Sequence, residues 1–368
     1  MTSPICRRRG SSSITSPACR SRTASRARSR GSRSTGRRIP KRTVRCRQTR
    51  SFRRTQRLAG SPAPPESAPS VVAIFGPTAS GKTAAAEAVA DRLGGEVVSA
   101  DSMQAYRGLP ILTAQPKRPT RLVGIWPLSH EGSVAEYARL AHAEVDELVG
   151  GGRTPVVAGG TGLYLRAALA DLELPPAPGR ELRTHWERVY DRLGADRAYA
   201  VLADRDPDAA ARLHPNDRRR VVRALELTEL GSSLRPDTDR LWTSDTRHPT
   251  VVFGLELPRD VLRARIERRA QAMFAAGVVH EVRAALAQPI STTAVHALGL
   301  REIADLSSDE ALAALSLRTW RYAAYQRKWM RRIPGLVSVN GDRAADEIAN
   351  DIVEMASARQ RLPARRAG

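Results

Sequence analysis

The chain has 368 residues, enough for two domains, and a formal net charge of +22. This charge is uneven, because residues 1–65 contain 19 of the 60 Lys and Arg residues and the first acidic residue is Glu66. All three cysteines also precede Glu66, which excludes a disulfide-stabilised core, a Cys-ligated zinc site and a cysteine nucleophile from the rest of the chain. No apolar run approaches the ~20 residues that span a bilayer, so we expect no membrane partner and a cytoplasmic protein.

Residues 1–66 form an Arg- and Ser-rich segment with few aliphatic side chains. Such a segment cannot bury enough apolar surface to offset the loss of chain entropy, so we predict a disordered tail. Three interpretations stay open: an arm that binds nucleic-acid phosphates, an organellar transit peptide, or upstream sequence included by the choice of start site. We favour the third because the tail has low complexity; translation would then start near Leu58 or Val71.

Strand and helix signals alternate after a Pro-rich linker at 61–70. The β-branched run 71–75 predicts a buried strand, a glycine loop follows, and 83–94 predicts an Ala-rich helix. Residues 96–101 predict a second strand ending at Asp101, 133–152 an amphipathic helix, and 154–162 a third strand running into a glycine turn. This alternation is typical of an α/β fold with a parallel sheet.

The β signal stops at about Pro175 and returns at 250–258, and the segments between them predict helices. Two further helices are predicted at 259–277 and 317–333, the second strongly basic. We therefore predict a P-loop NTPase-like parallel sheet with an inserted all-helical domain. The predicted domains are the tail (1–66), the P-loop α/β catalytic core (67–180 and 248–340), the helical insertion (181–247), and a C-terminal helix with a basic tail (341–368).

The segment "GPTASGKT" fits the phosphate-loop pattern G-x-x-x-x-G-K-[ST] and lies between a predicted strand and a predicted helix, as that motif requires. Its backbone N–H groups and the helix N-terminus would bind phosphate. Lys82 would add a cation, and the Thr83 hydroxyl would ligate Mg²⁺. The predicted phosphate-binding residues are Gly76, Pro77, Thr78, Ala79, Ser80, Gly81, Lys82 and Thr83.

An acid that would hold Mg²⁺ or position water for hydrolysis is missing from the end of the third predicted strand, which reads Gly159-Gly160-Thr161. The strand-end acid near the loop is Asp101. One interpretation is that Asp101 caps the following helix. The other is that it projects from the carboxyl edge of the sheet, where α/β proteins bind ligands.

The segment "HPNDRRRVVRALE" carries several arginines on a predicted helix. Arg219 and Arg223 are four residues apart and Arg220 and Arg223 three apart, so each pair shares a helix face. The face is either a solvated basic surface or a phosphate-binding surface, since guanidinium groups bind phosphate bidentately.

Four segments together resemble the tRNA dimethylallyltransferases, also called tRNA isopentenyltransferases or the IPP transferase family. They are "GPTASGKT", "SADSMQAYRG", "VVAGGTGLYLRA" and "HPNDRRRVVRALE", in this order and spacing. The resemblance covers about residues 71–340, with weaker agreement in "RIERRAQAMFAAGVVHEVRAAL", "ALGLREIADL" and "RYAAYQRKWMRR". No cysteine follows Cys46, so the Cys/His finger of some eukaryotic members is absent and the chain resembles the bacterial type.

The resemblance implies that the loop holds the diphosphate of dimethylallyl diphosphate rather than ATP for hydrolysis. The five-carbon group is then transferred to N6 of the adenosine just 3′ of the tRNA anticodon (position 37), in tRNAs that read codons beginning with U, and diphosphate leaves. The adenosine must flip out of its stack, and the helical insertion is expected to hold the anticodon stem-loop. We expect a monomer with no obligate protein partner.

The resemblance also implies roles for individual residues. An adenine amine is a weak nucleophile, so a carboxylate that accepts its proton would activate it, and Asp101 is the candidate. Gly81, Lys82, Thr83, bound Mg²⁺ and Arg223 would stabilise the departing diphosphate. Thr78 matches the hydroxyl near the transferred group, and Gln104 the residue that reads the target base. The predicted catalytic residues are Asp101, Thr78 and Arg223, and the predicted tRNA contacts are Asp101, Ser102, Met103, Gln104, Thr161, Arg183, Arg219, Arg220 and Arg223.

The sequence departs from the family pattern at several positions. The usual D-I-G-T-A-K-P is "PILTAQP" here, with Leu112 for Gly and Gln115 for Lys. The usual Y-A-K-R-Q is "YAAYQ", so Ala324 and Tyr325 replace two cations, and Arg219 replaces the first Gln of Q-R-x-x-R. We interpret these changes as variation in RNA contacts.

Three alternative functions are weighed against this hypothesis. A small-molecule P-loop kinase would explain the loop and the α/β core, but not Asp101 together with the Arg-rich helix and the insertion. An isopentenyltransferase that uses free adenine nucleotides would need no large RNA-binding insertion. A non-catalytic RNA-binding protein would depend on the Arg-rich tail, so deletion of residues 1–65 would abolish its RNA binding.

Overall fold

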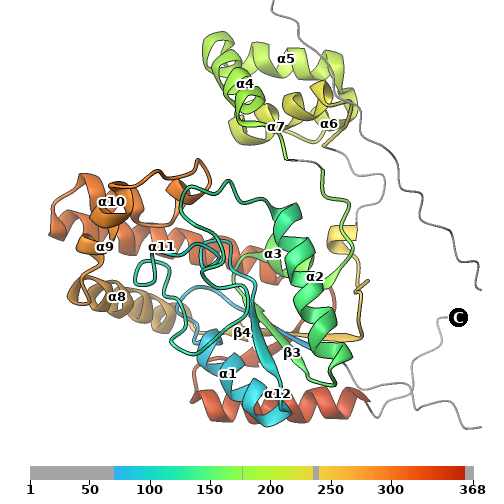
Figure 1. The fold of residues 1–368 in the computed structure, drawn as a ribbon, viewed down its shortest axis with the longest axis vertical. Helices are drawn as coiled ribbons and strands as arrows, with labels where there is room; N and C mark the ends of the chain where they lie inside the picture. The colour runs from blue at the N-terminus through green and yellow to red at the C-terminus, as the bar shows by residue number, and fades with distance from the viewer. Residues whose placement is uncertain (1–69, 176, 235–239, 361–368) are drawn as a thin grey trace, which may run out of the picture. The chain divides into compact units, whose positions relative to one another are not determined.

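The short apolar segments predicted as strands all pair in one parallel sheet (Figure 1). The computed structural model describes residues 70–175, 177–234 and 240–360, without the side chains of 359 and 360. Within these residues the sheet has five strands in the order β2-β3-β1-β4-β5. They are β1 (Val71–Phe75), β2 (Glu96–Ser99), β3 (Pro155–Gly159), β4 (Thr250–Glu256) and β5 (Val337–Asn340). The predicted parallel α/β fold is thereby confirmed, whereas the predicted tail and the chain beyond residue 360 lie outside the described residues.

Strand β1 is central, because it pairs with β3 on one side and β4 on the other. All five of its residues are buried, as expected for a parallel strand covered on both faces. Phe75 pairs with Gly159 of β3 and with Gly254 of β4 at the carboxyl end of the strand. The phosphate loop therefore leaves the sheet at its centre.

Helices follow the strands as the alternating sequence pattern predicts. They are α1 (Lys82–Leu93), α2 (Val134–Gly150), α3 (Gly162–Leu169), α4 (Arg180–Leu193), α5 (Ala195–Arg205), α6 (Pro207–Ala210), α7 (Arg218–Glu229), α8 (Arg259–Ala275), α9 (Val278–Leu286), α10 (Leu300–Asp305), α11 (Ser308–Met330) and α12 (Ala345–Gln360). Two short 3-10 segments are η1 (Arg240–Trp242) and η2 (Ala294–His296).

Alternate residues of β1 pack into two different hydrophobic layers. Val72 and Ile74 pack in the cluster that includes side chains of α1 and α12. Val71, Ala73 and Phe75 pack in the larger cluster with α2 and α3. Figure 1 shows α1 and α12 together below the sheet and α2 and α3 against its other side. The result is a helix–sheet–helix arrangement in which the carboxyl edge of the sheet stays available for a site.

Three features of the core differ from the prediction. Strand β2 ends at Ser99, two residues before the predicted end, because the chain turns at Asp101. Strand β5 was not predicted, since it has only four residues, pairs on one side only and alternates with the polar side chains Ser338 and Asn340. Helix α3 was not predicted, because it begins at Gly162, in the glycine turn expected after the third strand.

Helices α4 to α7 pack around a hydrophobic cluster of their own. Its buried members include Trp186 and Tyr190 of α4, Leu202 of α5, and Val221 and Leu225 of α7. The four helices lie between α3 and β4 in the chain, as the predicted insertion requires. The exact limits 181–247 stay a prediction.

The described residues were also searched for apolar spans. None of their helices combines the length and the hydropathy that crossing a membrane would require.

Candidate active site

The phosphate loop connects β1 to α1 and has an unusual backbone. Ala79 has φ 63°, a left-handed conformation that non-glycine residues rarely adopt, and Gly81 has φ 88°. No side chain caps α1 at Gly81, and its first turn contains no acidic residue. The first N–H groups of a helix have no intrahelical partner, so this end of α1 presents donors and a partial positive charge to an anion.

Two side chains in the loop are placed for phosphate. The Ser80 hydroxyl is fully buried and has no hydrogen-bond partner, which is costly unless a ligand supplies one. The Lys82 Nζ donates to the Pro77 carbonyl at 3.3 Å, at the mouth of the loop. Burial lowers the pKa of Lys82 from 10.5 to about 8, while the Asp101 charge raises it and the Arg269 charge lowers it. A diphosphate would restore the charge of this lysine.

Asp101 follows β2 at the same edge of the sheet. Its Oδ1 accepts the N–H of Met103 at 3.0 Å and closes a turn over residues 102–105. The interpretation as a helix cap is wrong, because the next helix in the chain is α2, which begins at Val134. Its charge also acts on the pKa values of Lys82 and Arg269, so the carboxylate lies within electrostatic range of the loop. Asp101 is partly exposed. One oxygen of Asp101 therefore fixes the turn, while the charge of the carboxylate still acts on Lys82 and Arg269.

The sequence reasoning missed two arginines of α8 that reach the loop. Arg269 donates to the Thr78 hydroxyl oxygen at 3.0 Å, and Arg265 donates to the Ser80 carbonyl at 3.4 Å. They are four residues apart, so they share a helix face. Burial lowers the pKa of the Arg269 guanidinium, and the Asp101 charge opposes this change. Ile266, the neighbour of Arg265 in sequence, lies in the core. The spacing of the apolar residues in α8 could therefore have shown that the side of the helix near Arg265 packs against the protein.

Gln326 of α11 joins the phosphate loop to the end of β3. Its Oε1 accepts the Thr78 N–H at 2.8 Å, and its Nε2 donates to the Gly160 carbonyl at 2.7 Å. The side chain is only 1% exposed. A Cβ at Gly160 would collide with the Gln326 amide, so the glycine is needed for this approach. At the strand end where a hydrolase carries an acid, this chain has the Gly160 carbonyl bound to the Gln326 side-chain amide.

The segment after Asp101 is held by amide groups. Gln104 donates to the Thr113 and Ala114 carbonyls and accepts from the Ser99 hydroxyl, so its side chain supports the 109–115 turn. Gln115, which replaces a family lysine, donates to the Gln104 and Tyr106 carbonyls at 3.2 and 2.7 Å. At this position the chain therefore has a neutral side chain that holds two backbone carbonyls in place of the cation of the family pattern.

Leu112, which replaces the glycine of the family pattern, is part of the hydrophobic core. Leu112 is 5% exposed and belongs to the main hydrophobic cluster. Its N–H and that of Ile111 both donate to the Glu281 carboxylate of α9 at 2.8 Å. The predicted contacts Ser102 and Met103 are partly buried in the turn before it, and Met103 packs against the same cluster.

Thr161 lies at the start of α3, and its hydroxyl is 3.4 Å from the Tyr322 hydroxyl of α11. Burial raises the pKa of Tyr322 to about 12, and the Asp101 charge raises it further in the same direction. Thr161 therefore lies on the same edge as Asp101, as its predicted role requires.

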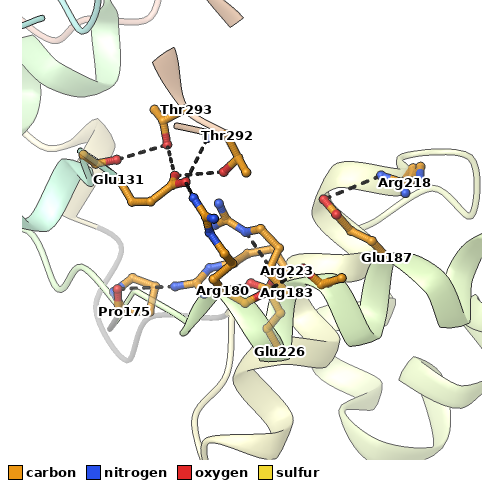
Figure 2. A network of polar contacts seen from close by, with 12 residues as sticks. Glu131, Pro175, Arg180, Arg183, Glu187, Arg218, Arg223, Glu226, Thr292 and Thr293 are labelled. Carbon is orange, nitrogen blue, oxygen red and sulfur yellow. Dashed lines mark hydrogen bonds and ion pairs between the residues drawn. The ribbon is translucent and has the colours of Figure 1, made fainter. Parts of the chain in front are cut away.

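The arginines predicted on the insertion form a different group (Figure 2). Glu226 is 1% exposed and accepts from Arg223 at 3.0 Å and from Arg183 at 3.4 Å. Arg223 also donates to the Pro175 carbonyl at 3.4 Å. These two arginines thus belong to an ion-pair cluster within the insertion, whereas the guanidinium groups that contact the phosphate loop are those of Arg265 and Arg269.

The remaining predicted residues of the insertion are at its surface. Arg219 and Arg220 are exposed, and Arg220 is 3.6 Å from Asp217. Asp217 caps α7, because its Oδ1 accepts the Arg220 N–H at 3.2 Å. The Asp of the "HPND" segment is therefore a helix cap, and the two exposed arginines are available to a polyanion.

No group of three or more His, Cys, Asp or Glu side chains that could hold a metal ion occurs among the described residues. A metal at this edge would have to share its ligands with substrate oxygens, as Mg²⁺ commonly does with phosphates.

A phosphate loop, a nearby carboxylate and two inward arginines at the carboxyl edge of a parallel sheet define a P-loop α/β protein built to hold a phosphorylated ligand beside an acid. The chain matches the IPP transferase family over residues 104–333 and the isopentenyl transferase family over residues 69–121. It belongs to the IPP transferase family and is an enzyme of the prenyl-transferring class.

Curated relatives support this assignment over most of their length. The tRNA dimethylallyltransferase of Streptomyces coelicolor is 42% identical over 295 residues, which cover 76% of this chain and 93% of that protein. The tRNA dimethylallyltransferase of Streptomyces griseus is 40% identical over 291 residues, covering 76% and 92%.

Solved structures agree with the fold. The full-length tRNA isopentenylpyrophosphate transferase of Bacillus halodurans matches with a TM-score of 0.58 and 33% identity, over 79% of this chain and 96% of that one. A eukaryotic dimethylallyltransferase acting on tRNA matches with a TM-score of 0.64 over 80% and 81% of the two chains. Its identity is 22%, so this likeness concerns the fold alone.

Proposed function

We propose that this protein transfers the dimethylallyl group of dimethylallyl diphosphate to N6 of the adenosine 3′ of the anticodon, in tRNAs that read codons beginning with U. The observation that carries the proposal is a phosphate loop that holds the unpartnered Ser80 hydroxyl and is contacted by Lys82 and Arg269, with Asp101 close enough for its charge to act on both cations. A carboxylate beside a diphosphate site suits transfer to a weak nucleophile, and the family membership supplies the two substrates.

In the proposed reaction the N6 lone pair attacks C1 of the dimethylallyl group while the C1–O bond to diphosphate breaks. The N6 proton passes to the Asp101 carboxylate, whose Oδ1 is already fixed by the Met103 N–H. This contact orients the carboxylate before substrate binds, which lowers the cost of reaching the reactive geometry. The products are N6-(dimethylallyl)adenosine and diphosphate.

The loop and its arginine would stabilise the departing diphosphate. The N-terminal N–H groups of α1 and the Lys82 cation would bind its oxygens, and the buried Ser80 hydroxyl would gain a partner. Arg269 donates to the Thr78 oxygen, so the Thr78 hydroxyl hydrogen is left for an acceptor on the substrate. These residues favour negative charge that develops on the leaving group.

The donor set also fits a magnesium ion. The partly buried Thr83 hydroxyl, in the first turn of α1, would hold Mg²⁺ together with diphosphate oxygens. When bound, the ion neutralises part of the charge of the diphosphate.

The insertion would contact the anticodon stem-loop through its exposed arginines, Arg219 and Arg220. Arg183 and Arg223, being paired with Glu226, would hold the insertion helices in shape for that contact. A cytoplasmic location and a monomeric state stay predictions.

The test is a transfer assay with the full-length chain, Mg²⁺, labelled dimethylallyl diphosphate and unmodified tRNA, with nucleosides identified by mass spectrometry. N6-(dimethylallyl)adenosine beside the anticodon is expected. A matched tRNA with guanosine at that position should give none. Product on free AMP but not on tRNA would support the nucleotide-modifying alternative, and ATP-dependent phosphorylation of a small acceptor would support the kinase alternative.

A further inference from the structure

An aromatic side chain is exposed on α11 near the candidate active site. Among the described residues, the large apolar side chains that are exposed are four leucines and Tyr325, which is 52% exposed. A single exposed ring needs no explanation by itself. Tyr325, however, lies one helical turn after Tyr322, which contacts Thr161. It also directly precedes Gln326, which holds the phosphate loop.

Tyr325 is the outer member of a connected array of rings. Its ring is stacked on that of Tyr322, with centroids 6.4 Å apart and an angle of 26°, and meets the Trp329 ring edge-on at 6.5 Å. Trp329 packs on Trp242 at 4.8 Å, and the Arg332 guanidinium lies 3.7 Å from the Trp242 ring centroid. The spacings of three and four residues place Tyr322, Tyr325 and Trp329 on one face of α11.

Helix α3 supports this array of rings. A Cβ at Gly162 would overlap the Trp329 ring, so this tryptophan lies directly on the start of α3. Trp242 belongs to the segment that returns from the insertion, and the buried Arg166 of α3 fixes that segment by donating to the Arg240 and Leu241 carbonyls at 2.9 and 3.0 Å. Tyr325 therefore rests on a preorganised support, which reduces the entropy lost when a ligand stacks on it.

Two cationic side chains share the face of α11 that carries Tyr325. They are Arg321, four residues before it, and Lys328, three residues after it. Both are exposed, and in the described part of the chain neither forms an ion pair with a carboxylate. An exposed ring flanked by cations without acidic partners is complementary to single-stranded nucleic acid, in which bases stack on aromatic rings and phosphates contact cations.

We propose that Tyr325 stacks on an unpaired base of the tRNA substrate, with the neighbouring cations of α11 on the adjoining phosphates. This inference rests on the proposed function, which supplies the RNA, and it assigns a role to a departure from the family pattern. Stacking releases no counterions, so loss of the Tyr325 ring should weaken tRNA binding without changing the salt dependence of the affinity.

The test measures the affinity of the full-length chain for unmodified tRNA at several salt concentrations. Tyr325→Ala should weaken binding by about 5-fold or more, the range for loss of one base–aromatic stack, with an unchanged slope of log affinity against log salt. Tyr325→Phe should bind like the unchanged protein. Leu317→Ala is the matched control, since Leu317 is 51% exposed on the same helix and should have no effect.

A second variant separates stacking from charge. Tyr325→Arg restores the family cation and should steepen the salt slope by roughly 0.7 to 0.9 for one additional phosphate contact. Wild-type affinity in Tyr325→Ala, or a Phe variant as weak as the Ala variant, would overturn the stacking proposal. Transfer activity is measured in parallel: an active protein whose affinity ignores Tyr325 refutes only the stacking, whereas an inactive protein whose RNA affinity depends on Tyr325 refutes only the proposed reaction.

Discussion

Arg269 and Arg223 are both helical arginines withdrawn from water, but their partners differ. Arg223 faces the buried carboxylate of Glu226 at 3.0 Å, whereas Arg269 contacts the neutral hydroxyl of Thr78 and forms no ion pair in the described part of the chain. A buried cation that is paired with a carboxylate is used by the fold, and one left without a carboxylate is available to a ligand. On this criterion we propose that the insertion cluster serves the fold and that the sheet edge is the reactive site.

The largest expected effect tests the chemistry of the sheet edge. Asp101→Asn keeps an oxygen for the Met103 N–H but removes the base, so kcat for transfer should fall by about 10²-fold or more, with tRNA affinity and Tm unchanged. Asp91→Asn, at an exposed acid near the end of α1, is the control and should be active. A fully active Asp101→Asn protein would remove Asp101 from proton transfer.

The next largest effect is expected from a matched pair of variants that compares Arg269 with Arg223. Arg269→Gln should lower kcat/KM for dimethylallyl diphosphate by about 10²-fold, as for the loss of a donor to developing charge, and leave Tm nearly unchanged. Arg223→Gln should change that ratio by only a few-fold and lower Tm instead. The opposite result would return Arg223 to the catalytic role expected from the sequence and assign Arg269 to structure. Both proteins are assayed at saturating tRNA, so that RNA affinity does not enter the ratio.

The insertion cluster makes a prediction about stability. Glu226→Gln leaves Arg183 and Arg223 without their buried counter-charge. We expect the free energy of unfolding to fall by about 2 kcal/mol, less than for a fully buried pair because both arginines are partly exposed. Urea unfolding of the full-length chain measures it, with the exposed Glu181→Gln of α4 as control. An unchanged midpoint would show that the cluster does not hold the helices together.

A smaller effect should appear in the pH dependence. Burial lowers the pKa of Lys82 to about 8, so in the unliganded protein this lysine is a cation below that pH and neutral above it. Because diphosphate binds the cation, kcat/KM should fall up to about tenfold per pH unit above 8. In Lys82→Arg the charge persists and this limb should be absent. Between pH 8 and 10.5 the unfolded chain holds a proton at Lys82 that the folded chain lacks, so Lys82 makes stability rise with pH there.

Local patterns predicted the sheet edge better than the partners that surround it. The phosphate loop and Asp101 were found because a strand, a turn and a helix follow one another in sequence. Arg269 and Gln326 were missed as site residues because they reach Thr78 across 191 and 248 residues. The role of Arg223 toward diphosphate came from the family resemblance and stays a prediction. Helical spacing left a solvated face and a phosphate-binding face open, and it could not show that a buried Glu226 accepts from this arginine. The short edge strand β5 escaped for a related reason, since its pairing with β4 is distant in sequence.

The smallest effect concerns Gln326, a buried and uncharged residue whose side-chain amide has hydrogen-bond partners for both its oxygen and its nitrogen. Gln326→Met keeps the volume but removes the hydrogen bonds to the Thr78 N–H and the Gly160 carbonyl. Each is worth about 1 kcal/mol net, so a looser loop should lower kcat/KM for dimethylallyl diphosphate about tenfold, chiefly through KM. Gln271→Met, at an exposed glutamine of α8, should change nothing. If Gln326→Met lowers Tm but leaves KM unchanged, the amide belongs with Arg223 among the residues that serve the fold; if KM rises, it belongs with Arg269 among those that shape the site.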